Sequence, residues 1–315
     1  MKRIALYFII LFVCGWYGVI HAQTAPQKQT AALIWEVTHP AKPGKLYLAG
    51  TVHACRPEMY PLDSVYDDTL AKSDYLVFEI AYPSPFAAMG FMMKQGFYPR
   101  ESQVFLPDMI GNEVFRDLCT VIQKTSPMMN QDRLKLMKPW TFFSLISAAF
   151  VQQEGFQTIH GMEKVIQRFV ANRNMEMRSL ETVASQLAVI AAPEQEADII
   201  FVLKDFYKDR KKALEELKTL LEVYRTGNDT LLAELNRECK EKTPRFYQAL
   251  IVARNQAMTD KLFAMLAEKK TGMVLVGLAH FCGSDSIRAM LEKKGCRIQT
   301  LKYHGKPGKI TAIAK

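Results

Sequence analysis

The sequence predicts an α/β fold in which a central mixed sheet is built from both ends of the chain and carries large helical insertions. Short, β-rich apolar runs concentrate near the two ends, whereas long helical patterns lie between them, at about residues 107–171 and 193–269. With 315 residues and 49% hydrophobic content, the chain can bury a sizeable core. No linker-like stretch divides it, so we expect one domain over residues 23–315.

Six short apolar runs have the pattern of strands, at residues 32–37, 46–50, 75–80, 177–180, 273–278 and 297–301. The helical patterns begin at residues suited to a helix start, such as Ser84 followed by Pro85. They cover residues 64–72, 85–95, 107–124, 139–153, 162–172, 182–191, 193–225, 230–240, 244–269 and 284–294.

The first 22 residues have the pattern of a secretory signal peptide. Lys2 and Arg3 form a basic start, residues 4–20 are apolar, and Ala22 provides a small residue at the cleavage end. Because this run is close to the ~18 residues needed to span a bilayer, an uncleaved N-terminal membrane anchor is the alternative. We therefore expect an exported protein, either periplasmic or secreted.

The charge of the chain indicates which partners to expect. The formal net charge is +9, and removal of residues 1–22 leaves 39 basic against 32 acidic residues, or +7. Basic and acidic residues alternate, for example in residues 204–218, and no nucleic-acid-binding module accompanies them. We expect a peptide or small-molecule substrate and no nucleic acid; peripheral contact with a membrane is compatible with this charge. The sequence does not set an oligomeric state.

Five cysteines follow residue 22, and none forms a C-x-x-C pair. This excludes zinc-ribbon and thioredoxin-like sites. An odd number of thiols leaves at least one unpaired, so the fold must depend on its apolar core rather than on a disulfide framework.

Two strand ends carry the same short pattern. The run ending in Gly50-Thr51-Val52-His53-Ala54-Cys55 and the run ending in Gly277-Leu278-Ala279-His280-Phe281-Cys282 both read as a strand followed by G-x-x-H-x-C. Ligands of α/β sheets bind beyond the carboxyl ends of the strands, so His53 and His280 are predicted to meet there. The glycines would allow close backbone approach just before each histidine.

A third strand end supplies a carboxylate. Glu79 follows four apolar residues, and an isolated carboxylate at such a place is costly to bury unless it is paired, hydrated or coordinating. Two imidazoles and one carboxylate can hold a divalent metal ion while leaving a position open for water. His53, Glu79 and His280 are therefore the predicted metal ligands.

These residues, together with others in the same order, carry a family resemblance. Residues 46–53 followed by Tyr60-Pro61-Leu62 resemble the opening of the TraB/GumN family, relatives of the Tiki proteases. Further matches along the chain are Glu79, Gly161-Met162-Glu163, Leu180-Glu181-Thr182 with Gln186, Arg254-Asn255, and residues 276–280 with Gly283 and the helix end at 291–295.

The resemblance implies an α/β fold similar to those of erythromycin-esterase-like and ChaN-like proteins, with both GxxH motifs at the site. Since Tiki proteins are metal-dependent proteases, it implies an exported metal-dependent hydrolase, in its most specific form a peptidase. The ion would be Zn, Mn or Co. Two alternatives stay open: a non-catalytic ligand- or peptide-binding envelope protein of the same fold, and a metal- or haem-handling protein.

Roles follow for the residues around the metal. Glu181 is a candidate general base or partner of a ligand, with a helix cap near Thr182 as the alternative. Arg254 would stabilise a developing oxyanion, or else form a structural ion pair with Glu181 or Glu163. The residues expected to orient the ligands are Gly50, Glu163, Gln186, Asn255 and Gly277. Cys55 and Cys282 are open to three interpretations, as a disulfide, as metal ligands or as inert core residues.

Overall fold

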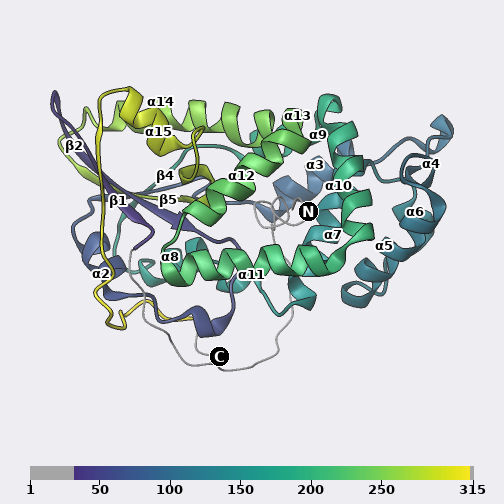
Figure 1. Cartoon of the computed structure of the whole chain (residues 1–315), viewed down its shortest axis with the longest axis horizontal. Coiled ribbons are helices and arrows are strands. Elements are labelled where there is room, and N and C mark those ends of the chain that lie inside the picture. Colours follow the sequence, from purple (N-terminus) through teal and green to yellow (C-terminus); the bar gives the residue numbers. More distant parts are fainter. Residues whose placement is uncertain (1–31, 313–315) are drawn as a thin grey trace.

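The structure, a computed structural model, describes residues 32–312 and is centred on one six-stranded mixed sheet (Figure 1). The strand order is β4-β3-β5-β2-β1-β6. Their bounds are β1 Ile34–His39, β2 Lys42–Thr51, β3 Tyr75–Phe78, β4 Glu176–Ser179, β5 Thr271–Gly277 and β6 Arg297–Thr300.

Four neighbouring strands run parallel, and this aligns their carboxyl ends. β2 pairs with β5, β5 with β3, and β3 with β4, all in parallel, whereas β1 is antiparallel to both β2 and β6. In the register of the parallel strands Thr51 lies opposite Gly277, and Phe78 lies opposite both Leu275 and Ser179. The segments that leave β2, β3, β4 and β5 therefore start from the same edge of the sheet.

The helices cover the sheet and extend away from it. In Figure 1, α14 and α15 lie above the sheet, α2 and α8 lie below it, and most other helices extend to the right. The α-helices are α2 Ser64–Ala71, α3 Pro85–Gln95, α4 Leu106–Ile110, α5 Asn112–Thr125, α6 Gln131–Leu134, α7 Pro139–Gln153, α8 Met162–Phe169, α9 Val183–Ala191, α10 Glu196–Lys208, α11 Arg210–Thr226, α12 Thr230–Lys242, α13 Pro244–Tyr247, α14 Arg254–Met265 and α15 Ile287–Lys293.

Shorter helical turns connect these elements. They are η1 Pro57–Met59, η2 Arg100–Ser102, η3 Thr158–His160, η4 Pro193–Gln195 and η6 Leu278–Phe281, together with the π-helical segment η5 Gln248–Ala253.

The predicted fold class is confirmed: strands from both ends of the chain form the sheet, and helices fill the two intervals between them. Three predicted helices are divided in the structure. Residues 107–124 are interrupted at Gly111, whose φ of +96° does not fit a helix. Residues 193–225 break at Asp209, whose side chain accepts from the backbone of Lys212 and so caps α11. Residues 244–269 change to π-helix at η5.

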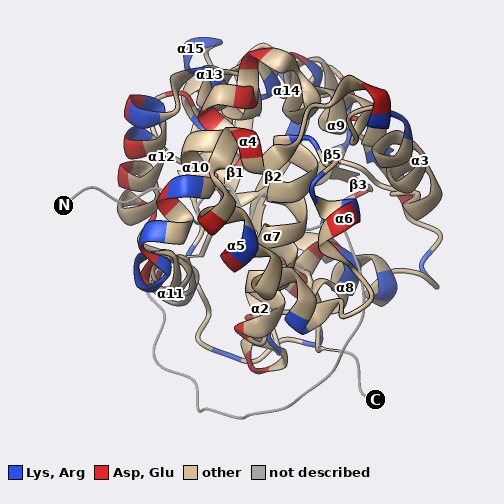
Figure 2. Cartoon of the chain, turned by 90° about the vertical axis from the view of Figure 1, so that its right-hand side faces the viewer, with Lys and Arg blue, Asp and Glu red and all other residues tan. Residues whose placement is uncertain are grey.

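The apolar core lies on and around the sheet. All four residues of β3 are buried, as are six of the seven in β5, which is the expected pattern for parallel strands covered on both faces. On the surface, Lys and Arg alternate with Asp and Glu along the helices (Figure 2). No helix among residues 32–312 is long and apolar enough to cross a membrane. The predicted signal peptide lies outside the described residues.

Candidate functional site

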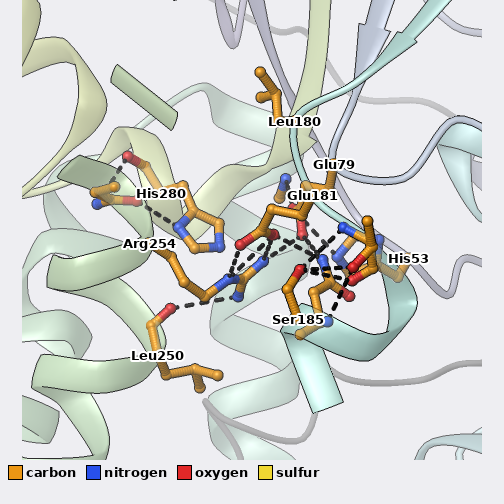
Figure 3. A network of polar contacts seen from close by, with 12 residues as sticks. His53, Glu79, Leu180, Glu181, Ser185, Leu250, Arg254 and His280 are labelled. Carbon is orange, nitrogen blue, oxygen red and sulfur yellow. Dashed lines mark hydrogen bonds and ion pairs between the residues drawn. The ribbon is translucent and has the colours of Figure 1, made fainter. Parts of the chain in front are cut away.

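Three strand ends bring the predicted metal ligands into one region (Figure 3). His53 lies two residues beyond β2, Glu79 directly follows β3, and His280 lies in η6, which continues β5. The Nε2 atom of His53 is 3.8 Å from the Oε1 atom of Glu79. Glu79 Oε1 also accepts from the backbone N–H of Gly277, the residue directly before η6. The parallel register thus gathers side chains that are 227 positions apart in the sequence (280 minus 53).

Both carboxylate oxygens of Glu79 accept hydrogen bonds. Oε1 accepts from the backbone N–H of Gly277 at 2.8 Å, while Oε2 accepts from Arg254 Nη2 at 2.7 Å and from Gln186 Nε2 at 2.9 Å. Burial alone would raise the pKa of Glu79, but the Arg254 charge, followed by those of the histidines, outweighs it and lowers the pKa to about 2. Glu79 is therefore a buried, ionised acceptor.

Arg254 is bound between two carboxylates. Its Nη2 atom donates to Glu181 Oε2 at 2.6 Å as well as to Glu79, and its Nε atom donates to Glu181 Oε1 at 2.9 Å. Gln186 Nε2 connects the same two carboxylates, since it also donates to Glu181 Oε2 at 3.0 Å. Burial opposes the guanidinium charge, but Glu79 and Glu181 outweigh it and raise the pKa of Arg254. The ion pair that was predicted with Glu181 is present, and Glu79 joins it.

A second carboxylate orients His53. Glu163, in the first turn of α8, accepts from the Nδ1 atom of His53 at 2.9 Å and also from the hydroxyl of Thr51. Burial disfavours the charged imidazole, yet Glu163 and Glu79 raise the pKa of His53 to about 9. Burial would raise the pKa of Glu163, but His53 and Thr51 lower it. With Nδ1 held by Glu163, Nε2 of His53 faces Glu79.

Asn255 orients His280 in the same way. Its Nδ2 atom donates to the carbonyl oxygen of Asp285 at 2.7 Å, so its Oδ1 atom is the acceptor for Nδ1 of His280 at 2.5 Å. Burial, together with the Arg254 charge, lowers the pKa of His280 to about 3, so the ring is neutral. The proton is then on Nδ1, and Nε2 is a buried acceptor with no hydrogen-bond partner among the described residues.

Two glycines permit the close contacts on which this region depends. A Cβ atom at Gly50 would collide with the side chain of Leu278, at the start of η6. A Cβ atom at Gly161 would collide with the carbonyl oxygen of His53, where α8 begins. The first glycine lets η6 lie against β2, and the second lets Glu163 reach His53.

The chain matches the family model of the TraB/PrgY/gumN family over residues 33–300. It belongs to this family. No curated protein and no solved structure shows significant similarity to the chain. The predicted resemblance is therefore confirmed at the level of the family, and the matched region contains every predicted site residue of this TraB/PrgY/gumN protein.

Two residues of the region were not predicted from the sequence. Thr51 donates to Glu163, and its place inside the first GxxH motif was the available indication. Asn236 of α12 donates to the carbonyl oxygens of Ala279 at 3.1 Å and Cys282 at 2.8 Å, on either side of His280. Nothing in the sequence around Asn236 links it to η6, because the contact depends on how the helical insertion folds back.

Two alternatives are wrong. The cap of α9 is Thr182, which forms a reciprocal capping box with Ser185, so Glu181 is not the cap. Cys55 and Cys282 do not form a disulfide; both are free and buried. Burial raises the pKa of each thiol, which keeps it protonated.

Whether a metal ion fits this site depends on the available ligand atoms and on the charge around them. Within residues 32–312, no three His, Cys, Asp or Glu side chains form a ready-made metal cage. However, Glu79, Glu163 and Glu181 bring three negative charges against the positive charges of Arg254 and protonated His53, which leaves a charge of −1. Two ligands about 2.1 Å from one ion lie roughly 3.5 Å apart, close to the 3.8 Å between His53 and Glu79. The spacing of His53 and Glu79 therefore fits joint ligation of a divalent cation, and the parallel register brings His280 to the same edge of the sheet.

Proposed function

We propose that this TraB/PrgY/gumN protein is a metal-dependent hydrolase, most specifically a peptidase, with His53, Glu79 and His280 as metal ligands. The observation that carries the proposal is the matched orientation of the two histidines. Each holds Nδ1 in a hydrogen bond to a side-chain oxygen, of Glu163 or of Asn255, and leaves Nε2 toward the interior. Ligands of metal ions in proteins are oriented by such outer hydrogen bonds.

A bound divalent ion would polarise a substrate carbonyl and lower the pKa of a bound water. The remaining chemistry falls to residues of this chain. Glu163 and Asn255 fix the imidazole orientation, so that the Nε2 atom of each ring is directed before any ligand arrives; His53 would give up its Nε2 proton on binding the ion. Glu181 is the candidate proton acceptor, because its carboxylate lies next to Glu79 and is held by Arg254 and Gln186.

Arg254 sets the electrostatics of the region. Its guanidinium keeps Glu79 ionised and so preserves a charged ligand in a buried place. It also brings permanent positive charge close to the reacting carbonyl, where it would favour an oxyanion.

The substrate would approach from the side of His53. This side chain is partly exposed, whereas His280 is fully buried. A narrow pocket beside His53 is lined mainly by apolar side chains, among them Leu220, Leu232 and Leu278. As it stands the pocket has room for little more than a water molecule, so a substrate group that enters it would have to displace these apolar side chains.

Metal analysis tests the proposal directly. The purified full chain is stripped with a chelator, incubated with Zn, Mn or Co, desalted and analysed for bound metal. We expect about one ion per chain in the wild type and a large loss in His53→Ala and His280→Ala. His304→Ala is the matched control, since His304 is a partly exposed histidine paired with Ser64 and Asp68.

Activity is then measured on a peptide library with the metal-loaded protein. Cleavage that is lost in both site variants and kept in the control supports a peptidase. Equal metal content in all four proteins would refute the metal site. Bound metal without cleavage of peptides or esters would favour the non-catalytic binding protein instead.

Export is the second part of the proposal, and it is supported by the basic start and apolar run of residues 1–22. N-terminal sequencing of the protein from its native cells tests it. A mature chain that begins at Gln23 is expected, and a chain that still begins at Met1 would contradict cleavage.

A further inference from the structure

Helix α3 carries a stripe of exposed apolar side chains. Phe86 is 79% exposed, Met89 53% and Met93 60%, and Tyr82 just before the helix is 73% exposed. We call these four residues the α3 patch. Phe86, Met89 and Met93 are spaced i, i+3 and i+7, so they share one face of the helix.

The opposite face of α3 already has its packing partners. Ala88, Phe91 and Met92 contact the core, the rings of Phe91 and Trp140 are 6.0 Å apart, and α3 packs beside α9. Figure 2 shows α3 at the periphery next to α9, with little charge on its ribbon. A helix that is apolar on all sides is normally buried. The α3 patch is therefore a surface that something outside the described residues should cover.

The charge carried by α3 itself is basic. Its only charged residue is Lys94, next to Met93; after the helix Arg100 is followed by Glu101, and before it Glu79 is buried in the ion pair with Arg254. Helix α8 lies near Tyr82, because Gln167 of α8 donates a hydrogen bond to the carbonyl oxygen of Ala81 at 2.7 Å. The next residue of α8, Arg168, is exposed. An apolar stripe with basic neighbours is complementary to a surface that is apolar inside and negatively charged outside.

We propose that the α3 patch docks on an anionic membrane surface. Phe, Met and Tyr side chains insert at the boundary between headgroups and acyl chains, while the basic side chains contact lipid phosphates. The short connection from Glu79 to Tyr82 places the candidate site close to that surface, which favours substrates at the membrane.

The test uses the full chain with a fluorescent reporter in the patch. Phe86→Trp is compared with Met128→Trp, a matched control because Met128 is also apolar and 93% exposed but lies in the loop between α5 and α6. Emission is recorded with vesicles of phosphatidylcholine containing phosphatidylglycerol, with and without brominated acyl chains. The wild-type signal from Trp16, Trp35 and Trp140 is subtracted.

With anionic vesicles, the reporter emission of the Phe86→Trp chain is expected to shift to the blue and to be quenched by the brominated lipid, while the control shows neither effect. This readout is local, so binding through residues 4–20 does not imitate it. Adding Met89→Asp to the reporter chain should weaken the response about tenfold, from the loss of one buried methionine. Higher salt and pure phosphatidylcholine should weaken it as well.

Four results would overturn the proposal. Reporter emission from Phe86→Trp that is unaffected by vesicles, or equally affected with and without phosphatidylglycerol, contradicts docking on an anionic surface. A blue shift without lipid that grows with protein concentration assigns the patch to a second copy. A blue shift without lipid at every protein concentration would mean that another part of the same chain covers the α3 patch. None of these results depends on the metal site, so the two proposals fail separately.

Discussion

Replacing Arg254 by methionine should destabilise the protein strongly. The guanidinium donates to Glu79 at 2.7 Å and to Glu181 at 2.6 and 2.9 Å, and the side chains of Arg254 and Glu79 are only 4% and 8% exposed. Methionine keeps most of the apolar stem but leaves both carboxylates without their cation. Removal of one partner from a buried ion pair costs about 3–5 kcal/mol. For a domain of this size we expect the Tm to fall by roughly 10 °C.

The pH dependence of this loss has a definite sign. In the wild type the folded pKa of Glu79 is about 2, below its ordinary value of 4.5, so its ionised form stabilises the fold above about pH 4.5 and this contribution is lost as the pH falls toward 2. In Arg254→Met, burial is no longer opposed by that charge and the folded pKa rises above the ordinary value. Protonation of Glu79 then removes the uncompensated buried charge of the variant. The difference in unfolding free energy between wild type and variant should therefore shrink as the pH falls from 7 to 5.

Chemical denaturation with chelator present measures both effects. Arg237→Met is the matched control, because Arg237 forms an exposed ion pair with Glu241 and its loss should change the unfolding free energy by less than about 1 kcal/mol. Adding Glu181→Gln to Arg254→Met should recover part of the loss, since one uncompensated charge is removed. A loss for Arg254→Met no larger than that of the control, or one independent of pH, would refute this account of the ion pair.

Three further predictions concern the surroundings of the site. Gly161→Ala should lower the unfolding free energy by about 1–3 kcal/mol, because the new Cβ meets the carbonyl oxygen of His53. The control Gly90→Ala places its Cβ in open space within α3 and should be neutral or slightly stabilising. Equal effects of the two changes in chemical denaturation would contradict the close approach of Gly161 to His53. Glu163→Gln should weaken metal binding about 10- to 100-fold in a competition titration, and unchanged affinity would separate Glu163 from the metal site. The five cysteines of the described chain are buried, so they should react with a thiol reagent only after unfolding; rapid labelling of the native protein would contradict this burial.

The strand ends were predictable from the sequence, whereas the ion-pair network was only partly so. His53, Glu79 and His280 each follow a short apolar run, and parallel pairing necessarily brings such ends to one edge of the sheet. The partners of Arg254 were less certain, because α14 is separated from β3 by about 175 residues and helical periodicity does not indicate which carboxylate it meets. Glu181 was among the predicted partners, whereas an ion pair was one of several possibilities for Glu79 and no partner was named for it.

The helical insertions contribute more to the site than their sequence indicated. Asn236 comes from α12, inside the second insertion, and holds the backbone on both sides of His280. The preceding helices were predicted as one continuous helix over residues 193–225, but the capping side chain of Asp209 ends α10 and begins α11. Local capping chemistry competes with apolar periodicity at such a position, and the sequence alone does not decide between them.

The junction between η5 and α14 explains how neighbouring residues serve two parts of the site. Arg254 and Asn255 are consecutive, yet one contacts the carboxylates of Glu79 and Glu181 and the other holds His280. Adjacent side chains on an α-helix diverge by about 100°, so both can reach the site only if the helix start points into it, between β3 and η6. The π-helical turn directly before Arg254 alters the helical phase at this point, as π-helical segments often do at functional sites. The Arg-Asn pair therefore couples the charge of Glu79 to the orientation of His280 through one rigid element.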